Sequence, residues 1–162
     1  MQIRPAYSSD FSTIQQLAHQ IWPVAYASIL APEQLHYMLN LFYSPEALSD
    51  QVKNGQHFFL LEDEKEAIGF AAIEFNAKPK YTKLHKLYVL STLQQKGYGA
   101  YLMEFCIQQA TAAEQTHLYL NVNRYNSAID FYTKKGFQIT ATVDVSIGNG
   151  YLMEDYVMTR KL

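Results

Sequence analysis

The chain lacks a second cysteine, a long apolar run and an excess of either charge. Its one cysteine, Cys106, cannot close a disulfide within the chain, which favours a reducing, cytoplasmic setting. No apolar stretch approaches the roughly 20 residues of a membrane-spanning helix, and Met1–Pro5 lacks the apolar core of a signal peptide. The net charge of -2 gives the protein no general attraction for nucleic acid. We therefore expect neither a membrane nor a nucleic-acid partner.

The composition that remains is that of one globular domain. The chain has 162 residues, of which 49% are hydrophobic and 17% charged, enough for a sizeable core in a single domain spanning 1–162. No internal repeat, low-complexity tract or linker divides it. The 13 tyrosines favour a core rich in aromatic rings and an aromatic-lined cleft.

Apolar spacing and turn residues predict seven strands and four or five helices, since two or three short helices follow the first strand. The expected strands are Met1–Pro5, His57–Glu62, Ala67–Phe75, Lys83–Leu90, His117–Val122, Phe137–Val143 and Tyr151–Met158. The expected helices begin at Ser8 or Ser9, at Pro32, at Pro45, at about Gly97 and at Asn126. We expect Pro23 to end the first helix, which leaves Trp22 and Tyr26 in a loop or bend. This order predicts an α/β (α+β) fold, a mixed sheet with helices on its faces.

The most informative stretch is Gln94–Gly99, between an apolar strand and a helical pattern. A loop of this kind presents unpaired backbone N–H groups at the positive end of a helix, and such donors bind anions. Gly97 and Gly99 let the backbone approach a phosphate, and Lys96 adds a cation. The stretch therefore predicts a phosphate or pyrophosphate site.

Two blocks of residues resemble a known family. Gln94, Gly97 and Gly99 after a strand match the R/Q-x-x-G-x-G/A motif of the GCN5-related N-acetyltransferases (GNAT). Asn126–Phe137 resembles the N-x-x-A-x-x-F-Y-x-K-x-G-F segment of the same family. The strand Lys86–Leu90 and the tail Ile147–Met158 further resemble the PaiA-type spermidine/spermine acetyltransferases. The resemblance covers nearly the whole chain.

The resemblance implies the GNAT acyl-CoA acyltransferase fold and acetyl-CoA as donor. In this fold a mostly antiparallel, seven-stranded sheet is flanked by helices, and its central parallel strands, here Leu84–Leu90 and His117–Val122, splay apart. The thioester enters between them. The resemblance assigns no metal, and the five histidines have no metal-ligand spacing.

Residue roles carried over from the family remain expectations. The backbone of Gln94–Gly99 would hold the pyrophosphate, and Tyr132 would protonate the leaving thiolate. The edge of β-strand Leu87–Val89 would pair with the pantetheine amides and polarise the thioester carbonyl. Asn126 would bind the cofactor arm, a role compatible with capping a helix. The full set expected at the cofactor is Leu87, Tyr88, Val89, Gln94, Gln95, Lys96, Gly97, Tyr98, Gly99, Asn126 and Lys134, although Lys96 and Lys134 are equally typical of solvated surface charges.

A base is also needed, because an ammonium has no lone pair with which to attack. Glu74 is one candidate, since alternation places it on one apolar face with Ile68, Phe70 and Ala72. His85 is the other, on a face shared with Leu87 and Val89. Glu74 and His85 could each also be an ordinary structural residue. A water molecule that relays the proton from the amine is a further possibility.

The acceptor is the least determined part. In the resembling fold, the first helix–helix loop and the last hairpin flank the amine, so Trp22, Tyr26, Tyr151 and Asp155 are candidate substrate-binding residues, although plain packing explains each equally well. Cys106 lies four residues after Leu102 and is expected to be an inert core residue. The sequence thus predicts an N-acetyltransferase for a small primary amine, with a polyamine as the first candidate. A protein N-terminus or lysine, and a catalytically silent CoA-binding module, stay as alternatives, and the oligomeric state is open, a homodimer included.

Overall fold

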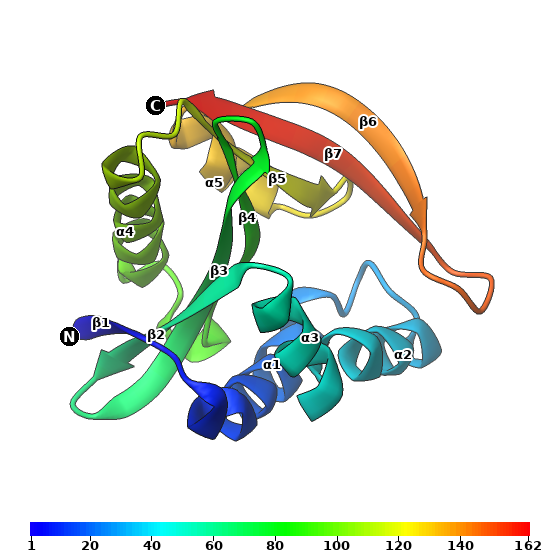
Figure 1. The fold of residues 1–162 in the computed structure, drawn as a ribbon. Helices are drawn as coiled ribbons and strands as arrows, with labels where there is room; N and C mark the ends of the chain where they lie inside the picture. Colours follow the sequence, from blue (N-terminus) through cyan, green and yellow to red (C-terminus); the bar gives the residue numbers. More distant parts are fainter.

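A computed structural model describes residues 1–162 as a single twisted sheet with helices on both faces (Figure 1). The seven strands follow the order β1-β2-β3-β4-β5-β7-β6. The strands are β1 (Gln2–Pro5), β2 (Gln56–Asp63), β3 (Glu66–Lys78), β4 (Tyr81–Val89), β5 (His117–Asn123), β6 (Gln138–Ser146) and β7 (Leu152–Lys161). The helices are α1 (Phe11–Ala25), α2 (Pro32–Tyr43), α3 (Pro45–Lys53), α4 (Tyr98–Ala112) and α5 (Ala128–Lys134). The predicted fold class and all seven strands are confirmed.

The neighbouring strands β4 and β5 run parallel, whereas the other neighbours are antiparallel. Their pairing begins with Tyr81 opposite His117 and ends with Leu84 opposite Leu120. Beyond that point β4 continues to Val89 and β5 to Asn123 without pairing with each other. The predicted splay of the central strands is therefore present, and each strand has an unpaired edge there.

Two β-bulges alter the faces that simple alternation predicts. Ala72 pairs with Lys86 and Ile73 with Leu84, so His85 is an extra residue in β4. The prediction that His85 shares a face with Leu87 and Val89 is wrong, because the bulge turns its side chain to the face of Glu74.

A second bulge lies between β2 and β3, where Leu61 pairs with Gly69 and Glu62 with Ala67. Ile68 is the extra residue, and it packs in the core on the α4 side of the sheet. The prediction that Glu74 shares a face with Ile68 is therefore wrong, whereas Phe70 and Ala72 do lie on the other face with it.

The sheet separates two hydrophobic cores. One, on the side of α4 and α5, includes the fully buried Leu102, Met103 and Cys106. The other, on the side of α1, α2 and α3, includes Trp22 and Tyr43. None of the helices is long and apolar enough to cross a membrane.

Helix α1 runs through Pro23 and ends at Ala25, so the prediction that Pro23 terminates it is wrong. Trp22 is inside the helix, and Tyr26 is its C-cap, with a backbone N–H that donates to the Trp22 carbonyl at 2.9 Å. Burial explains the continuation, since Ile21 and Trp22 are anchored in the core beside the proline. The aromatic side chains of Trp22 and Tyr26 are consequently held by a helix instead of a loop.

Candidate active site

The loop before α4 leaves a row of backbone donors free. The first N–H of this region to bond within the helix is that of Tyr101, which donates to the Gly97 carbonyl at 3.0 Å. The N–H groups from Gln95 to Ala100 have no backbone acceptor. They converge at the positive end of a 15-residue helix, which is the arrangement that binds phosphate groups. Gln94, Gln95 and Lys96 are thus at the expected anion site, where the Lys96 side chain is exposed.

The two glycines of this loop are present for different reasons. Gly97 caps the helix with a φ of +85°, a left-handed conformation that favours glycine. Gly99 has no such backbone requirement, and an added Cβ would meet only the Phe131 ring at 3.9 Å, an ordinary contact. The protein itself does not need glycine at 99, so the open space there fits a ligand that approaches the backbone. Tyr98 between them anchors the loop by donating to Asp63 at 2.9 Å.

The strand before this loop supplies an open edge. Leu87, Tyr88 and Val89 pair with β3 on one side, and β5 has already separated from them on the other. An extended ligand with amide groups can pair with such an edge as an added strand does. The edge leads directly to the anion-binding loop, so the two parts fit one long ligand with a phosphate end.

Tyr132 lies on α5, its ring packed against Phe131 and Phe137 at centroid distances of 5.4 Å and 5.8 Å. Burial raises the pKa of the Tyr132 hydroxyl, and Tyr26 and Cys106 are close enough to add to the shift. A hydroxyl that stays protonated at neutral pH is able to donate a proton to a leaving group. Cys106 itself is fully buried, and burial raises the pKa of its thiol to about 12, which confirms the inert assignment.

Asn126 precedes the same helix, and its side-chain oxygen accepts from the Ala128 N–H at 2.9 Å. The N-cap of α5 is Ser127, so Asn126 lies one residue earlier than predicted, but its side chain still accepts from the first N–H of the helix. Its amide NH₂ remains available to a ligand. Lys134 at the other end of α5 is exposed.

The two candidate bases form a pair. His85 Nε2 lies 2.7 Å from Glu74 Oε2, and both side chains are partly buried at 19% and 29% exposure. Burial lowers the pKa of His85 to about 4, although the bond to Glu74 opposes the shift. The imidazole is therefore neutral near pH 7 and donates its Nε2–H to the carboxylate. Glu74 keeps a second oxygen for a proton from elsewhere.

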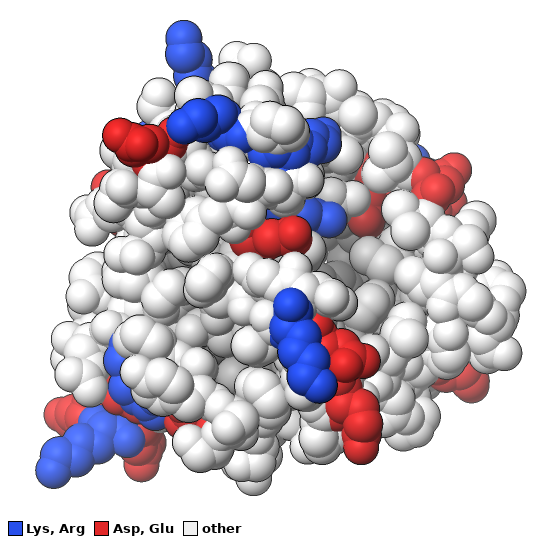
Figure 2. All heavy atoms as spheres, in the orientation of Figure 1, with Lys and Arg blue, Asp and Glu red and all other residues white.

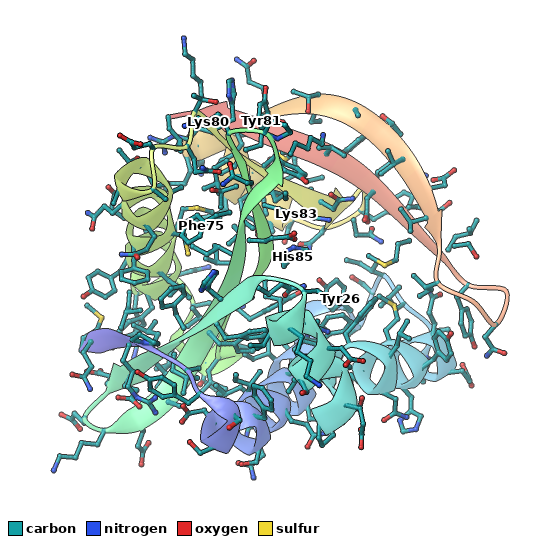
Figure 3. The ribbon with its side chains drawn as sticks, in the orientation of Figure 1. Tyr26, Phe75, Lys80, Tyr81, Lys83 and His85 are labelled. Atoms are coloured by element: carbon teal, nitrogen blue, oxygen red, sulfur yellow. The ribbon has the colours of Figure 1, made fainter.

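Three aromatic side chains, Trp22, Tyr26 and Tyr88, cluster on the α1 side of the sheet. The hydroxyls of Tyr26 and Tyr88 share a hydrogen bond of 3.0 Å, and the Trp22 ring lies 4.7 Å from the Tyr26 ring. Figure 3 shows Lys83, His85 and Tyr26 in succession along β4 toward α1. Trp22 lies in the core on the α1 side of the sheet, with Tyr26 and Tyr88 packed against it, and a role of Trp22 and Tyr26 in substrate binding stays a prediction.

The next candidate residue, Asp155, lies on β7. It is only 3% exposed, and its Oδ2 accepts no hydrogen bond. Burial raises the pKa of the Asp155 carboxyl, against the effects of Asn121, Lys83 and Arg124. Figure 2 shows a hollow in this face of the molecule, with acidic and basic side chains together beside it.

Tyr151 does not join this group. Its ring packs on Tyr37 of α2 at 5.3 Å, where the Tyr37 hydroxyl also donates to the Ile147 carbonyl at 2.6 Å. The residue fastens the β6–β7 hairpin to α2, which is a packing role. The observed contact of Tyr151 is with α2, and its contact with an acceptor stays a prediction.

Sequence reasoning missed two lysines of β4. Lys83 lies opposite Glu74 in the β3–β4 register, and burial lowers its pKa. Lys86 is 8% exposed, and its ammonium is held by the side-chain oxygens of Gln51 and Gln56 at 2.7 Å and 3.2 Å. Burial lowers the pKa of Lys86 to about 7. The available signal was a pair of lysines in a central strand of the predicted sheet, but the bulge at His85 makes the face of each lysine unpredictable from alternation.

Comparisons with known proteins agree with this geometry. A family model described as an acetyltransferase (GNAT) domain matches residues 27–160. No curated protein matches the sequence. The solved structure of the PaiA N-acetyltransferase from Thermoplasma acidophilum with coenzyme A is 24% identical, with a TM-score of 0.83 over 99% of this chain and 98% of that one.

Two further solved structures share the fold. A GCN5-related N-acetyltransferase from Rhodopseudomonas palustris is 19% identical, with a TM-score of 0.84 over 99% of this chain and 95% of that one. The ribosomal-protein-S18-alanine N-acetyltransferase from Escherichia coli is 17% identical, with a TM-score of 0.74 over 99% and 92%. At identities below 25%, these structural matches show a shared fold alone.

Proposed function

The chain belongs to the GNAT acetyltransferase family, and from this premise we propose that it moves an acetyl group from acetyl-CoA to a primary amine of a small molecule. The observation that carries the proposal is the row of free N–H groups from Gln95 to Ala100, which adjoins the open edge of β4. That row fits a pyrophosphate, and the edge fits the amides of a pantetheine arm.

The residues of the chain divide the work of a direct transfer within a ternary complex. Bound acetyl-CoA supplies an activated acetyl group as a thioester. The Leu87–Val89 edge offers N–H groups to the thioester carbonyl, and the gap between β4 and β5 admits the amine from the other side. No covalent acetyl-enzyme is needed, since the one cysteine is buried and protonated.

Two groups handle the protons. Glu74, held by His85, accepts a proton from the amine directly or through a water, which generates the neutral nucleophile. Tyr132 returns a proton to the sulfur of the leaving thiolate, a role supported by its raised pKa. The two groups belong to opposite faces of the sheet, because Tyr132 packs on the α4 side and Glu74 shares the face of Phe70 and Ala72, so separate residues take and return the proton.

The acceptor is proposed to be a small primary amine, with polyamines as the first class to test because of the PaiA resemblance. A protein N-terminus or lysine is the second candidate, since a ribosomal-protein acetyltransferase shares the fold. A CoA-binding module without turnover is the third.

The test is release of CoA thiol from acetyl-CoA with a panel of polyamines, amino acids and peptides. Thiol release above background that depends on the amine supports the enzyme. Stabilisation of the protein by CoA, without thiol release from any amine, would leave only the binding module. A thermal shift that CoA and a simple nucleotide produce equally would argue against both.

A further inference from the structure

Strand β6 is a long, open edge of the sheet. It is the last strand in the sheet order, beyond β7, its one neighbour (Figure 1). Eight of its nine side chains are exposed, and the ninth is half-buried. Ile139 is 50% exposed on the face of Met158, and Val145 is 41% exposed on the face of Met153. The strand is therefore covered on neither face, and the backbone N–H and C=O groups of its outer side have no strand partner.

The two edges of the sheet differ in their protection against pairing. The other edge, β1, has four residues, carries the charged Arg4 and ends at Pro5, and each of these features discourages a further strand. The sequence of β6, QITATVDVS, has no lysine, arginine or proline. Its one irregularity is a bulge between Ile139 and Ala141, at the start of the strand. From Ala141 to Ser146 the edge is regular and unprotected.

The single charge on this regular segment is already neutralised. The Asp144 carboxylate accepts a hydrogen bond from Arg124 Nη2 at 2.7 Å, within an ion pair. A strand that approaches the β6 edge consequently meets side chains that are apolar, hydroxylic or charge-paired. Electrostatic repulsion, which keeps many edge strands apart, is weak here.

The segment Ala141–Val145 is complementary to itself in the antiparallel direction. With a two-fold axis at Val143, that residue lies opposite its own copy, and Ala141 lies opposite Val145. These apolar pairs share one face of the strand, because they involve alternate residues. On the other face Thr142 lies opposite Asp144, so the two carboxylates stay apart and each meets a hydroxyl.

We propose that a second copy of this chain covers the edge, in a two-fold homodimer whose β6 strands pair antiparallel about Val143 and join the two sheets into one. The only other edge that the chain offers is β1, which is short and ends at a proline. A contact between β6 and β1 would also be head-to-tail and would not close at two copies. Pairing of two β6 edges satisfies the free backbone groups of both copies at once.

Cysteine cross-linking tests the pairing and its register. The natural Cys106 is fully buried, so an introduced surface cysteine is the one able to react. At the axis, the Cα atoms of residue 143 in the two copies would lie about 4.5 to 5.5 Å apart, which suits a disulfide. Val143→Cys is therefore expected to give a disulfide-linked dimer on mild oxidation, measured by non-reducing gel electrophoresis.

Val145→Cys is the matched control, because residue 145 lies on the same strand and the same face as residue 143. In the proposed register the two copies of residue 145 are four residues apart along the strand, about 14 Å, which is too far for a disulfide. A mixture of Ala141→Cys and Val145→Cys should cross-link instead. Equal cross-linking of Val143→Cys and Val145→Cys, or none by Val143→Cys, would overturn the proposal.

The mass in solution gives an independent test. Light scattering of the natural protein should give twice the 18.6 kDa of one chain. Val143→Lys places two ammonium groups at the axis and should raise the dissociation constant of the dimer at least about tenfold. Val24→Lys, at a valine of α1 that is 62% exposed, should leave it unchanged.

A natural protein that is monomeric at every concentration measured would overturn the proposal, and so would a Val143→Lys dimer as tight as the natural one. If Val143→Lys has no cooperative thermal melt, the cross-linking variants still decide. Both readouts are independent of turnover, so the dimer and the proposed acetyl transfer stand or fall separately.

Discussion

The two sides of the splayed strands are built in different ways. On the donor side, backbone N–H groups from one short run, Gln95–Ala100, make the site, and the lysines nearby are exposed. On the proposed acceptor side, the candidate groups are side chains from the end of α1 and from β3, β4 and β7, at positions as far apart as Tyr26 and Asp155. A backbone site needs only a local conformation, whereas a side-chain site needs the whole sheet in register.

The difference extends to electrostatics. The donor side can bind a strongly charged phosphate through neutral dipoles in contact with water. The acceptor side holds ionisable groups away from water, and burial lowers the pKa of His85 and Lys83 while it raises that of Asp155. We infer that binding on the donor side depends mainly on backbone conformation, whereas binding on the acceptor side depends mainly on the charge of its side chains. Four sets of variants test this contrast.

The largest effect is expected from Tyr132→Phe, at the boundary between the two sides. Removing the hydroxyl removes the proton donor but keeps the ring against Phe131 and Phe137, so kcat should fall about 100-fold with CoA affinity unchanged. Steady-state kinetics and CoA titration measure both, with Tyr7→Phe, an exposed tyrosine, as the control. A loss of CoA binding would instead make Tyr132 a structural residue.

A second variant tests whether burial of the Lys86 ammonium on the acceptor face of the sheet destabilises the folded protein. Burial lowers the pKa of Lys86 to about 7 in the folded protein, against the ordinary lysine value of 10.5. Between these values the unfolded chain binds a proton that the folded chain does not, so the Lys86 contribution to stability rises with pH.

The free energy of unfolding of the natural protein, relative to Lys86→Met, should therefore rise by about 2 kcal/mol from pH 7 to pH 9. Urea denaturation at each pH measures it, and the exposed Lys53→Met is the matched control. A difference that does not change with pH would mean that Lys86 stays charged beside Gln51 and Gln56.

Glu74→Gln tests the proposed base. Glutamine keeps a hydrogen bond with His85 but cannot take up a proton, so we expect kcat to fall about tenfold, with the CoA affinity unaltered. Glu66→Gln, in the same strand but exposed, provides the comparison. If kcat stays the same, the proton passes to water or to another carboxylate.

The smallest effects separate the two glycines of the donor loop. Gly99→Ala should weaken CoA binding by about tenfold because its Cβ occupies space at the phosphate site, and it should not lower the melting temperature because that Cβ meets only Phe131, at 3.9 Å. Gly97→Ala should lower stability by about 1 kcal/mol because of the positive φ. Calorimetric CoA titration and thermal melts of both variants provide the data. Equal effects of the two on stability would refute a ligand-related role for Gly99.

Sequence reasoning performed best where the signal was local. Ser44, Pro45 and Gly55 mark the ends of α3, and the Ser44 hydroxyl does cap it by accepting from the Ala47 N–H at 3.1 Å. Local reasoning failed at Pro23, because core contacts of neighbouring residues outweighed the missing hydrogen bond. Local reasoning also failed at His85 and Ile68. A bulge depends on the partner strand, and the extra residue that it inserts changes the face of the sheet on which the following side chains lie.

The amino-acid sequence by itself determined the seven strands, the glycine loop before α4, the acetyl-transfer family and the burial of Cys106. These features follow from residues close together in the chain, where propensity and hydrogen-bond geometry act directly. The tertiary structure alone decided that Glu74 meets His85, that Tyr26 meets Tyr88, and that the ammonium of Lys86 is buried against Gln51 and Gln56. Those contacts depend on strand register and on two bulges, and they exist only once strands from both halves of the chain share one sheet.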